Sequence, residues 1–347
     1  MIDIASHTIH LESTVTDALV QMEKLGQHLT LFVVDDDSRL MGTLTDGDIR
    51  RGLIKRLGLQ DKVELFMFRH PSYVSKNNFT VQDIAKIKEK GVLLLPVLDE
   101  SKRIVKIANL NTTQTILPLD VVVMAGGEGR RLRPLTEKTP KPLLKVGEKP
   151  IIEHNLDRLI HFGIDDYWIC IRYLGEQLQQ FFGNGESKNV SINFIWEDQP
   201  LGTIGAIRKI KDFKHDHILV TNSDLLTNLD YESFFVDFVT NGADFSVATI
   251  PYSVNIPYAV LDTANGHVVS FKEKPTYTYY SNAGIYLMKK EVLEHIPDGF
   301  YNATDLMEKL IQDGRKVISY PIIGYWLDVG NPQDYAKANQ DIKHLKF

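Results

Sequence analysis

Apolar residues recur with a helical period near the start of the chain and in short continuous runs after it. Val15, Ala18, Leu19 and Met22 show the spacing of one face of a helix, and Gly26 stands where that helix is expected to end. Two apolar runs separated by an acidic turn follow, and a second helical pattern comes after them. The segment 13–57 therefore predicts helix, strand, turn, strand and helix in that order.

A similar order recurs over residues 79–111, FTVQDIAKIKEKGVLLLPVLDESKRIVKIANLN. A helical pattern again ends at a glycine, Gly91, and an apolar strand, an acidic turn and a second strand follow. Repetition of one supersecondary unit indicates two copies that pack against each other. We therefore expect an α+β pair of similar units over residues 1–116.

The second half, residues 117–347, alternates strand patterns with helical patterns. Buried-looking strands are LDVVVMA, YWICI, INFIW, HILVTN and FSVATI, and amphipathic helices between them are IIEHNLDRLIHFG and TIGAIRKIKDF. Strands that alternate with helices predict an α/β fold, here a Rossmann-like, mainly parallel sheet with helices on both faces. Ligands of such sheets bind at the carboxyl ends of the strands.

Composition narrows the classes of protein without selecting one. The chain has 347 residues, 43% of them hydrophobic and 24% charged, which suits a soluble protein of two domains. A formal net charge of −6 argues against general binding of nucleic acid or of a membrane surface. Cys170 is the single cysteine, so no internal disulfide forms. With neither a signal-peptide pattern nor an apolar run of membrane-spanning length, we expect a cytoplasmic protein.

Positive charge is concentrated in residues 121–150, VVVMAGGEGRRLRPLTEKTPKPLLKVGEKP, where an apolar strand runs into a glycine turn. Glycines let backbone N–H groups approach a ligand closely, and seven Lys or Arg follow within twenty positions, so the segment predicts an anion site. A Walker loop is excluded because no Gly-Lys-Ser or Gly-Lys-Thr occurs there. A dinucleotide fingerprint is excluded because Pro134, Pro140 and Pro142 prevent the regular helix that it opens.

The same stretch resembles the signature of the sugar-1-phosphate nucleotidyltransferases, Ala-Gly-Gly-x-Gly-(Thr/Ser)-Arg-Leu-x-Pro-x-Thr-x-x-x-Pro-Lys-Pro, with Arg130 in place of Thr or Ser. Five further motifs follow in the order of that family, so the resemblance covers roughly residues 119–340 and implies a GT-A-like sheet. They are EDQPLGTIGAI (197–207), VTNSDLL (220–226), FKEKP (271–275), NAGIY (282–286) and YWLDVGNPQDY (325–335). A glycosyltransferase shares this architecture, but its Asp-x-Asp motif is absent from VTNSDLL.

This resemblance implies a reaction in which a sugar-1-phosphate oxygen attacks the α-phosphorus of a nucleoside triphosphate and pyrophosphate is released. The attacking phosphate is already ionised at neutral pH, so the enzyme must position two polyanions and stabilise charge. Arg131 and the loop N–H groups would hold the β- and γ-phosphates, and Lys141 would lie near the α-phosphate. Lys274 would bind the sugar phosphate. A magnesium cofactor would be bound by Asp224 and Asp328.

The other site residues implied by the resemblance fall into two groups. Nucleotide contacts are expected from Ala125, Gly126, Gly127, Gly129, Glu197, Gly202 and Thr203. Sugar contacts are expected from Glu273, Asn282 and Gly284. Tyr277, Tyr279 and Tyr280 could stack on a base or a sugar, or could be ordinary strand residues.

The loop and EDQPLGT are most similar to guanylyltransferases that act on mannose-, heptose- or glucosamine-1-phosphate, so we expect GTP, with UTP or CTP as the alternative. Arg172 stands where the family often has Asn, which bears on the choice of base or sugar. An alternative from another class is a non-catalytic sensor of sugar nucleotides linked to the first half of the chain. Such a sensor would be expected to lack an arginine, lysine or aspartate of the site, and all of them are present.

The first half resembles a tandem of CBS domains, regulatory modules that often bind adenine nucleotides. GTLTDGDI carries Gly42, Thr45 and Asp48 in the Gly-x-x-Thr-x-x-Asp order of that family, where Thr and Asp would hold a ribose and its phosphate. The second copy, KIANLNT, departs from this order at all three positions. At most one site for an adenine or guanine nucleotide is implied, and the alternative is a module that only dimerises. Because such pairs associate face to face, we expect a two-fold homodimer.

Overall fold

The computed structural model describes residues 2–26, 29–76 and 78–345, which form two compact units. The first unit contains the described residues up to 118 together with 158–166 and 182–192. The second contains 119–157, 167–181 and the described residues from 193 onward. Within these ranges, no helix is both long and apolar enough to cross a bilayer.

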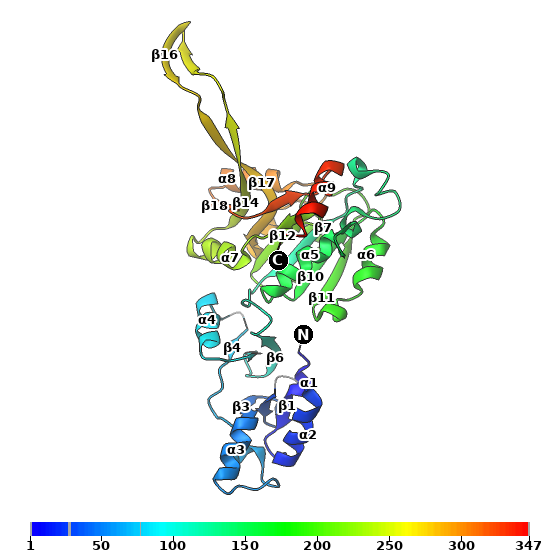
Figure 1. Cartoon of the computed structure of the whole chain (residues 1–347), viewed down its shortest axis with the longest axis vertical. Coiled ribbons are helices and arrows are strands. Elements are labelled where there is room, and N and C mark those ends of the chain that lie inside the picture. Colours follow the sequence, from blue (N-terminus) through cyan, green and yellow to red (C-terminus); the bar gives the residue numbers. More distant parts are fainter. Residues whose placement is uncertain (1, 27–28, 77, 346–347) are drawn as a thin grey trace. The chain divides into compact units, whose positions relative to one another are not determined.

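The first unit repeats one three-stranded arrangement (Figure 1, blue to cyan). Its sheets have the orders β1-β2-β3 and β4-β5-β6, and in both the first pair is parallel and the second antiparallel. The strands are β1 (Thr8–His10), β2 (Thr30–Val34), β3 (Leu40–Thr45), β4 (Val74–Ser75), β5 (Leu94–Leu98) and β6 (Ile104–Asn109). The helices are α1 (Ile4–His7), α2 (Val15–Leu25), α3 (Asp46–Ile54) and α4 (Val81–Glu89). The predicted duplication of an α+β unit is confirmed.

Each half of the first unit has its own apolar core. Of the helix face predicted in α2, Val15, Ala18 and Met22 are buried in the core of the first half, and Leu19 is partly buried against it. In the second half, Ile84 of α4 is buried in one cluster with Leu95 of β5. Helical periodicity therefore identified the buried side of α2 correctly.

The second unit is built on a seven-stranded sheet with the order β11-β10-β7-β12-β17-β14-β18. Strands β7 and β12 are parallel, as are β14 and β18, whereas β17 is antiparallel to both of its neighbours. The strands are β7 (Asp120–Ala125), β10 (Asp166–Ile171), β11 (Ser191–Trp196), β12 (His217–Asn222), β14 (Phe245–Asn255), β17 (Thr276–Lys289) and β18 (Val317–Pro321). The helices are α5 (Ile151–His161), α6 (Gly175–Phe182), α7 (Tyr231–Thr240), α8 (Ala303–Gln312) and α9 (Pro332–Asp341). The predicted α/β fold is confirmed, with β17 as an antiparallel member.

One predicted helix is wrong. The segment TIGAIRKIKDF, residues 203–213, forms only a short 3-10 helix at Gly205–Lys209. The N–H of Gly205 donates to the carbonyl oxygen of Tyr301 at 3.2 Å, outside any helix. A Cβ on Gly205 would also come within 2.3 Å of the Gly299 carbonyl oxygen, so this backbone lies directly on a neighbouring loop. The segment packs its backbone against this loop, and this contact takes the place of the regular helix that the apolar spacing predicts.

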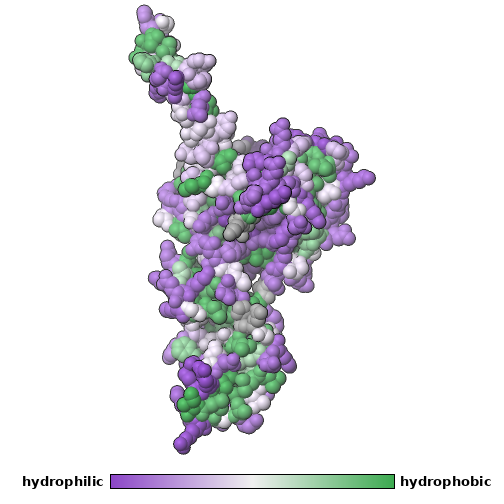
Figure 2. Space-filling model, in the orientation of Figure 1, coloured by the Kyte–Doolittle hydropathy of each residue, from purple (hydrophilic) through white to green (hydrophobic). Residues whose placement is uncertain are grey.

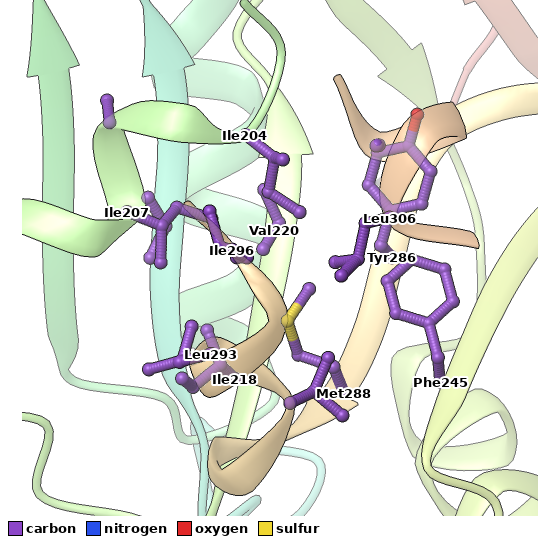
Figure 3. Close-up of a cluster of buried hydrophobic side chains, with 14 of the residues drawn as sticks. Ile204, Ile207, Ile218, Val220, Phe245, Tyr286, Met288, Leu293, Ile296 and Leu306 are labelled. Atoms are coloured by element: carbon purple, nitrogen blue, oxygen red, sulfur yellow. The ribbon is translucent and has the colours of Figure 1, made fainter. Parts of the chain in front are cut away.

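Apolar side chains from β12 and β17 pack with those of the segments beside them (Figure 3). Ile218 and Val220 of β12 and Met288 of β17 are buried in one cluster with Ile207 and Leu306. Burial of each such side chain stabilises the fold by about 1.5–3 kcal/mol. The cluster therefore holds β12 rigidly, and the carboxyl end of β12 is where the site described below is found.

Strands β14 and β17 continue past the sheet as a two-stranded arm, residues 251–281, which projects from the sheet in Figure 1 (yellow). The end of the arm is formed by β15 (Val260–Ala264) and β16 (His267–Lys272). Asn265 and Gly266 connect them with φ of 48° and 79°. Positive φ at both positions is typical of a type I′ hairpin turn. Nearly all side chains of the arm are exposed.

Candidate active site

The glycine loop after β7 is shaped by close contacts that exclude larger residues. A Cβ on Gly126 would lie 2.9 Å from a carboxylate oxygen of Glu197, so glycine lets that carboxylate pack on the loop backbone. Gly129 has a φ of 61°, which glycine adopts without strain, and its carbonyl accepts a 2.9 Å hydrogen bond from the Thr136 hydroxyl. The following residues form a 3-10 turn at Arg130–Leu132, so the loop does not open a regular helix, as predicted.

A cleft of about 300 Å³ lies at the carboxyl ends of β7 and β12. Parallel neighbours in a sheet end at the same edge, which brings together motifs that are far apart in the sequence. Seven of the residues predicted for the site line this cleft. They are Gly126, Gly127, Lys141, Glu197, Gly202, Thr203 and Asp224. Ala125 is buried at the end of β7, directly before the loop.

Lys141 lies between two carboxylates. Its ammonium group pairs with Asp224 Oδ2 and lies 3.8 Å from Asp328 Oδ1. The pairing of β13 (Leu225–Thr227) with β19 (Trp326–Asp328) places these aspartates side by side. The structure thus brings together the lysine and both aspartates that the motifs single out.

The carboxylate pair fits a divalent cation. The buried Oδ1 atoms of Asp224 and Asp328 accept no hydrogen bond from any described residue. Burial, and next the charge of Asp224, raise the pKa of Asp328. Two adjacent carboxylates with spare acceptor atoms suit Mg²⁺, which completes its shell with phosphate oxygens and water. No group of three metal-ligating side chains occurs in the described part of the chain, so such an ion would depend on substrate oxygens.

Arg131 is close to the same carboxylates. A Cβ on Gly330 would lie 3.2 Å from Arg131 Nη2 and 3.4 Å from Asp328 Oδ1, so both groups lie next to this glycine. The guanidinium charge opposes the rise in the pKa of Asp328 that burial causes. Arg131 therefore contributes positive charge beside the carboxylate pair, within reach of an anion in the cleft.

Three guanidinium groups lie near the carboxylate of Glu128 in the glycine loop. Arg130 donates a 2.7 Å hydrogen bond to it, and Arg172 and Arg133 lie 3.5 and 3.7 Å away. The hydrogen bond from Arg130 is the main cause of a lowered pKa of Glu128. Arg130, which replaces the Thr or Ser of the signature, is thus engaged within the loop. Arg172, by contrast, lines the cleft.

Glu197 presents a buried carboxylate to the cleft. Its side chain accepts a 3.2 Å hydrogen bond from the Leu201 N–H, and only 6% of the residue is exposed. Burial raises its pKa. No cation among the described residues forms an ion pair with it. Each oxygen of an ionised carboxylate can accept more than one hydrogen bond, so Glu197 can also accept hydrogen bonds from a ligand in the cleft.

The predicted sugar residues divide into two groups. Gly284 has a φ of 73° and a Cβ there would lie 2.5 Å from Asn222 Nδ2, so it lies against a residue that lines the cleft. Asn282 accepts a 2.9 Å hydrogen bond from the Gly284 N–H. Glu273 and Lys274 are instead exposed on the arm and do not line the cleft. They stand between β16 and β17, beyond the outermost pair of β14 with β17, Asn255 with Thr276.

Thr45 and Asp48 of the first unit form the start of α3. The Thr45 oxygen accepts from the Asp48 N–H at 3.3 Å, and Asp48 Oδ2 accepts from the Thr45 N–H at 2.9 Å. Arg51 also donates to Asp48 at 2.5 Å. The same reciprocal box caps α2 and α4. Its members there are Thr14 with Asp17 and Thr80 with Asp83. This pattern therefore has a local helix-capping function wherever it occurs.

Several cleft residues were not predicted as ligands. Asn222 and Ser223 belong to the VTNSDLL motif and stand directly before Asp224 at the same strand end. Their position next to a predicted site residue is the signal that could have identified them. Arg172 was expected to bear on the choice of base or sugar, but it was not predicted as a residue of the site. Phe300 lines the cleft although it is 62% exposed, and nothing in its sequence surroundings distinguishes it.

The sheet, the glycine loop and the paired carboxylates define a nucleotide-handling α/β protein, and comparison with known proteins identifies its family. Residues 120–344 match the Nucleotidyl transferase family, so the chain belongs to that family and is a nucleotidyltransferase. Residues 3–55 match the CBS domain.

Individual relatives agree with this assignment. The chain is 29% identical over 230 residues to D-glycero-alpha-D-manno-heptose 1-phosphate guanylyltransferase of Aneurinibacillus thermoaerophilus, a match that covers 65% of this chain and 99% of the relative. It is 30% identical over 231 residues to mannose-1-phosphate guanylyltransferase of Mycobacterium tuberculosis, covering 65% of this chain and 64% of that protein. Among solved structures it resembles HddC from Yersinia pseudotuberculosis complexed with GMP-PN, with a TM-score of 0.51, 26% identity and coverage of 64% and 99%.

Proposed function

We propose that this chain is a sugar-1-phosphate guanylyltransferase, which forms a GDP-sugar and pyrophosphate from GTP and a mannose-, heptose- or glucosamine-type 1-phosphate. The observation that carries the choice of base is the buried carboxylate of Glu197 in the cleft. Names of relatives that match the same part of the chain support the choice of substrates.

The argument for guanine rests on hydrogen-bond donors. An ionised carboxylate can only accept hydrogen bonds. The Watson–Crick edge of guanine offers two adjacent donors, N1–H and the N2 amino group, which match the two oxygens of one carboxylate. Uracil offers a single N–H between two carbonyl oxygens, which a carboxylate repels. Glu197 therefore favours GTP over UTP. The alternatives, transfer from UTP or from CTP, are distinguished from it by the experiment described below.

At the phosphate end of the site, the reaction needs positive groups that compensate negative charge, and it needs no group that transfers a proton. An oxygen of the sugar phosphate forms a bond to the α-phosphorus, and the bond from that phosphorus to the bridging oxygen of pyrophosphate breaks, so no proton needs to move. Lys141 and Arg131 neutralise the charge that accumulates on the phosphoryl oxygens. Asp224 and Asp328 would hold a Mg²⁺ ion, which supplies further positive charge to the phosphates when bound.

The sugar end of the site has two parts in this proposal. Asn282 and Gly284 form the floor beside Asn222, where a polar amide can bond sugar hydroxyls. Glu273 and Lys274 bind the sugar and its phosphate, as the FKEKP motif implies. Both residues are exposed on the arm and do not line the cleft.

The experiment that tests this function is pyrophosphate release with Mg²⁺. GTP, UTP, CTP, ATP and dTTP are each combined with a panel of sugar-1-phosphates. The proposal predicts release with GTP and at least one of the three named sugar types. Release only with UTP or CTP would overturn the choice of base. Nucleotide binding without release from any pair would instead indicate a non-catalytic sensor of sugar nucleotides.

The first 116 residues form a regulatory tandem CBS module and residues 117–347 the catalytic domain, in a cytoplasmic two-fold homodimer. Regulation would use an adenine or guanine nucleotide bound at Thr45 and Asp48. The repeated capping box offers a matched control: Asp48→Ala and Asp17→Ala remove equivalent caps, each costing about 1 kcal/mol. Titration with ATP, AMP and GTP should show weakened binding only for Asp48→Ala. Equal nucleotide affinities of the two variants would contradict a nucleotide site at Thr45 and Asp48 and would leave dimerisation as the function of the module.

A further inference from the structure

We propose that Arg172 determines specificity for guanine, by donating hydrogen bonds to O6 and N7 of a base whose N1–H and N2 amino group are bound by Glu197. The inference rests on the function proposed above, because it takes the base in the cleft to be guanine. What it adds is a second recognition residue for the other polar edge of the base, at a position where the family often has Asn.

Arg172 and Glu197 stand at neighbouring strand ends. β10 ends at Ile171 and β11 at Trp196, so each of the two residues is the first after its strand. These strands are neighbours in the sheet, and the Glu197 N–H donates to the Ile171 carbonyl oxygen at 3.0 Å. Both residues line the same cleft. A carboxylate and a guanidinium are therefore presented to one ligand from adjacent positions of the backbone.

The pair lies toward the β11 end of the cleft. In the sheet order β11-β10-β7-β12, Glu197 and Arg172 follow the first two strands, whereas Asp224 follows the fourth. Adjacent strands are about 4.8 Å apart, so β10 and β12 are separated by about 10 Å. Lys141, which pairs with Asp224, marks the β12 end as the place for the phosphates. A nucleotide has its base and its phosphates at opposite ends, so its base falls toward Arg172 and Glu197.

Glu128 of the glycine loop orients the Arg172 side chain. Its Oε1 lies 3.5 Å from Arg172 Nη2, and Arg130 donates to both of its oxygens, at 2.7 and 3.3 Å. A guanidinium has five N–H groups, so a contact through one Nη atom leaves other donors for a ligand. Arg130 and Arg172, which both depart from the family, thus meet on one carboxylate. Arg130 fixes Glu128, and Glu128 holds the Arg172 guanidinium beside the cleft.

The backbone that carries Arg172 is also held in place. The hydroxyl of the next residue, Tyr173, lies 3.0 and 3.2 Å from the carbonyl oxygens of Thr136 and Glu137, to which it donates. The turn after β10 is therefore attached to the proline-containing loop. A donor that is already positioned loses less conformational freedom when it binds a ligand. Arg172 is thus suited to recognise a base of fixed orientation.

Guanine has the pattern of donors and acceptors that this pair of residues matches. O6 and N7 are both acceptors, and an arginine that donates to both is the commonest specific contact with guanine in DNA complexes. N1–H and the N2 amino group are donors, which suit the carboxylate of Glu197. Adenine has an amino donor in place of O6, which a guanidinium repels. Arg172 therefore adds discrimination against ATP, whose amino group Glu197 alone could accept.

The charge of Arg172 also supports the contact made by Glu197. Burial raises the pKa of Glu197, and the nearby guanidinium of Arg172 opposes that rise. Only the ionised carboxylate offers both oxygens as acceptors without a proton of its own. Lys209 acts on this carboxylate in the same direction, but it pairs with Asp198 at 3.2 Å and does not line the cleft. The two cations therefore differ in access to the base, which makes Lys209 a matched control.

A GTP analogue tests the contact in the wild-type enzyme. 7-Deaza-GTP carries a C–H group in place of N7 and keeps the other polar groups of the base. With one accepted sugar-1-phosphate, we expect kcat/KM for pyrophosphate release to be about 10-fold lower with 7-deaza-GTP than with GTP. Equal values, in an enzyme that prefers GTP to UTP, would overturn the role of Arg172 and leave the proposed function intact. This comparison needs no variant, so it does not depend on the folding of one.

Substitution of Arg172 tests the same contact from the side of the protein. Arg172→Gln should lower kcat/KM for GTP about 10- to 100-fold, change that for UTP less, and use GTP and 7-deaza-GTP equally well. Arg172→Lys keeps the charge but not the two-pronged geometry, so it should not restore the preference for GTP over 7-deaza-GTP. Lys209→Gln should keep the wild-type preference. An equal loss with every nucleotide in Arg172→Gln would assign Arg172 to the phosphates and overturn the inference.

Failure of the proposed function gives a different result. Pyrophosphate release with UTP or CTP alone would show that the enzyme does not act on GTP, whatever Arg172 contacts. If no pair of substrates releases pyrophosphate, the affinities of GTP and 7-deaza-GTP are compared by titration. Weaker binding of 7-deaza-GTP by the wild type, but not by Arg172→Gln, would support the contact. Equal affinities in both proteins would overturn it.

Discussion

The inner and outer halves of β14 and β17 belong to the same two strands, yet their surroundings are opposite. From Phe245 to Thr249 every residue of β14 is buried, and β17 is buried from Ala283 to Met288. Beyond these points the ladder continues, but the side chains are exposed. Backbone pairing is therefore common to both halves, and only side-chain burial separates them.

The inner and outer halves also differ in composition. The inner halves, FSVAT and AGIYLM, are mostly apolar and carry a single tyrosine, Tyr286. The outer halves carry tyrosines, threonines and serines, and Tyr252 stands opposite Tyr279. Tyrosine combines apolar area with a polar hydroxyl and is enriched at protein interfaces. The inner half thus belongs to the buried sheet beside the cleft, whereas the outer half, which projects from the molecular surface in Figure 2, exposes its aromatic side chains.

Removing the charge at the centre of the cleft should have the largest effect. Lys141→Gln keeps a hydrogen-bonding group for Asp224 but removes the cation beside the phosphates. We expect kcat to fall about 10³-fold, as for other losses of transition-state charge stabilisation. Lys149→Gln, which removes an exposed pair with Asp157, serves as the control and should retain wild-type kcat. Equal kcat values for the two variants would contradict a catalytic role for Lys141.

Leucine-to-alanine changes in the two halves compare burial directly. Leu287→Ala in the inner half should lower the free energy of unfolding by about 2–5 kcal/mol, because it opens a cavity in a fully buried cluster. Leu261→Ala on the arm should change it by less than about 0.5 kcal/mol at concentrations where the protein is monomeric. Urea denaturation measures both. Similar losses would show that the arm packs on its own chain.

Changing the buried carboxylate should alter the choice of base. Glu197→Gln replaces one acceptor oxygen with an amino group, which cannot accept the second donor of guanine. We expect kcat/KM for GTP to fall about 10²-fold while that for UTP changes less. Wild-type enzyme should show a similar loss with ITP, which lacks the N2 amino group. Unchanged use of ITP would contradict a direct contact between Glu197 and that group.

The smallest effect concerns pH. Burial raises the pKa of Asp328 above its ordinary value of 3.8, so the native state binds the proton more tightly than the unfolded chain. Stability from this group is therefore full below 3.8 and is lost as pH rises through the native pKa. Asp328→Asn should raise the free energy of unfolding at pH 7 without magnesium, by less than about 1 kcal/mol because the side chain is partly exposed. The gain should vanish near pH 3.5, and a destabilised variant at pH 7 would contradict this sign.

The alternation of strands and helices predicted the architecture because burial on a sheet follows local periodicity. Motif order likewise predicted that Lys141, Glu197 and Asp224 would share one cleft, since each stands at or after a strand end. The course of the arm was not predictable, because FKEKP reads the same whether its strands fold onto the cleft or continue outward. Phe300 and the 3-10 turn after Gly202 also escaped prediction, because contacts with distant loops determine them.

The most direct test of the account is the ratio of kcat/KM for GTP to that for UTP, measured by pyrophosphate release with one accepted sugar-1-phosphate. A buried carboxylate that pairs with guanine predicts a ratio of at least about 10². A ratio near one, or a preference for UTP, would show that Glu197 does not select the base and would contradict the proposed guanylyltransferase.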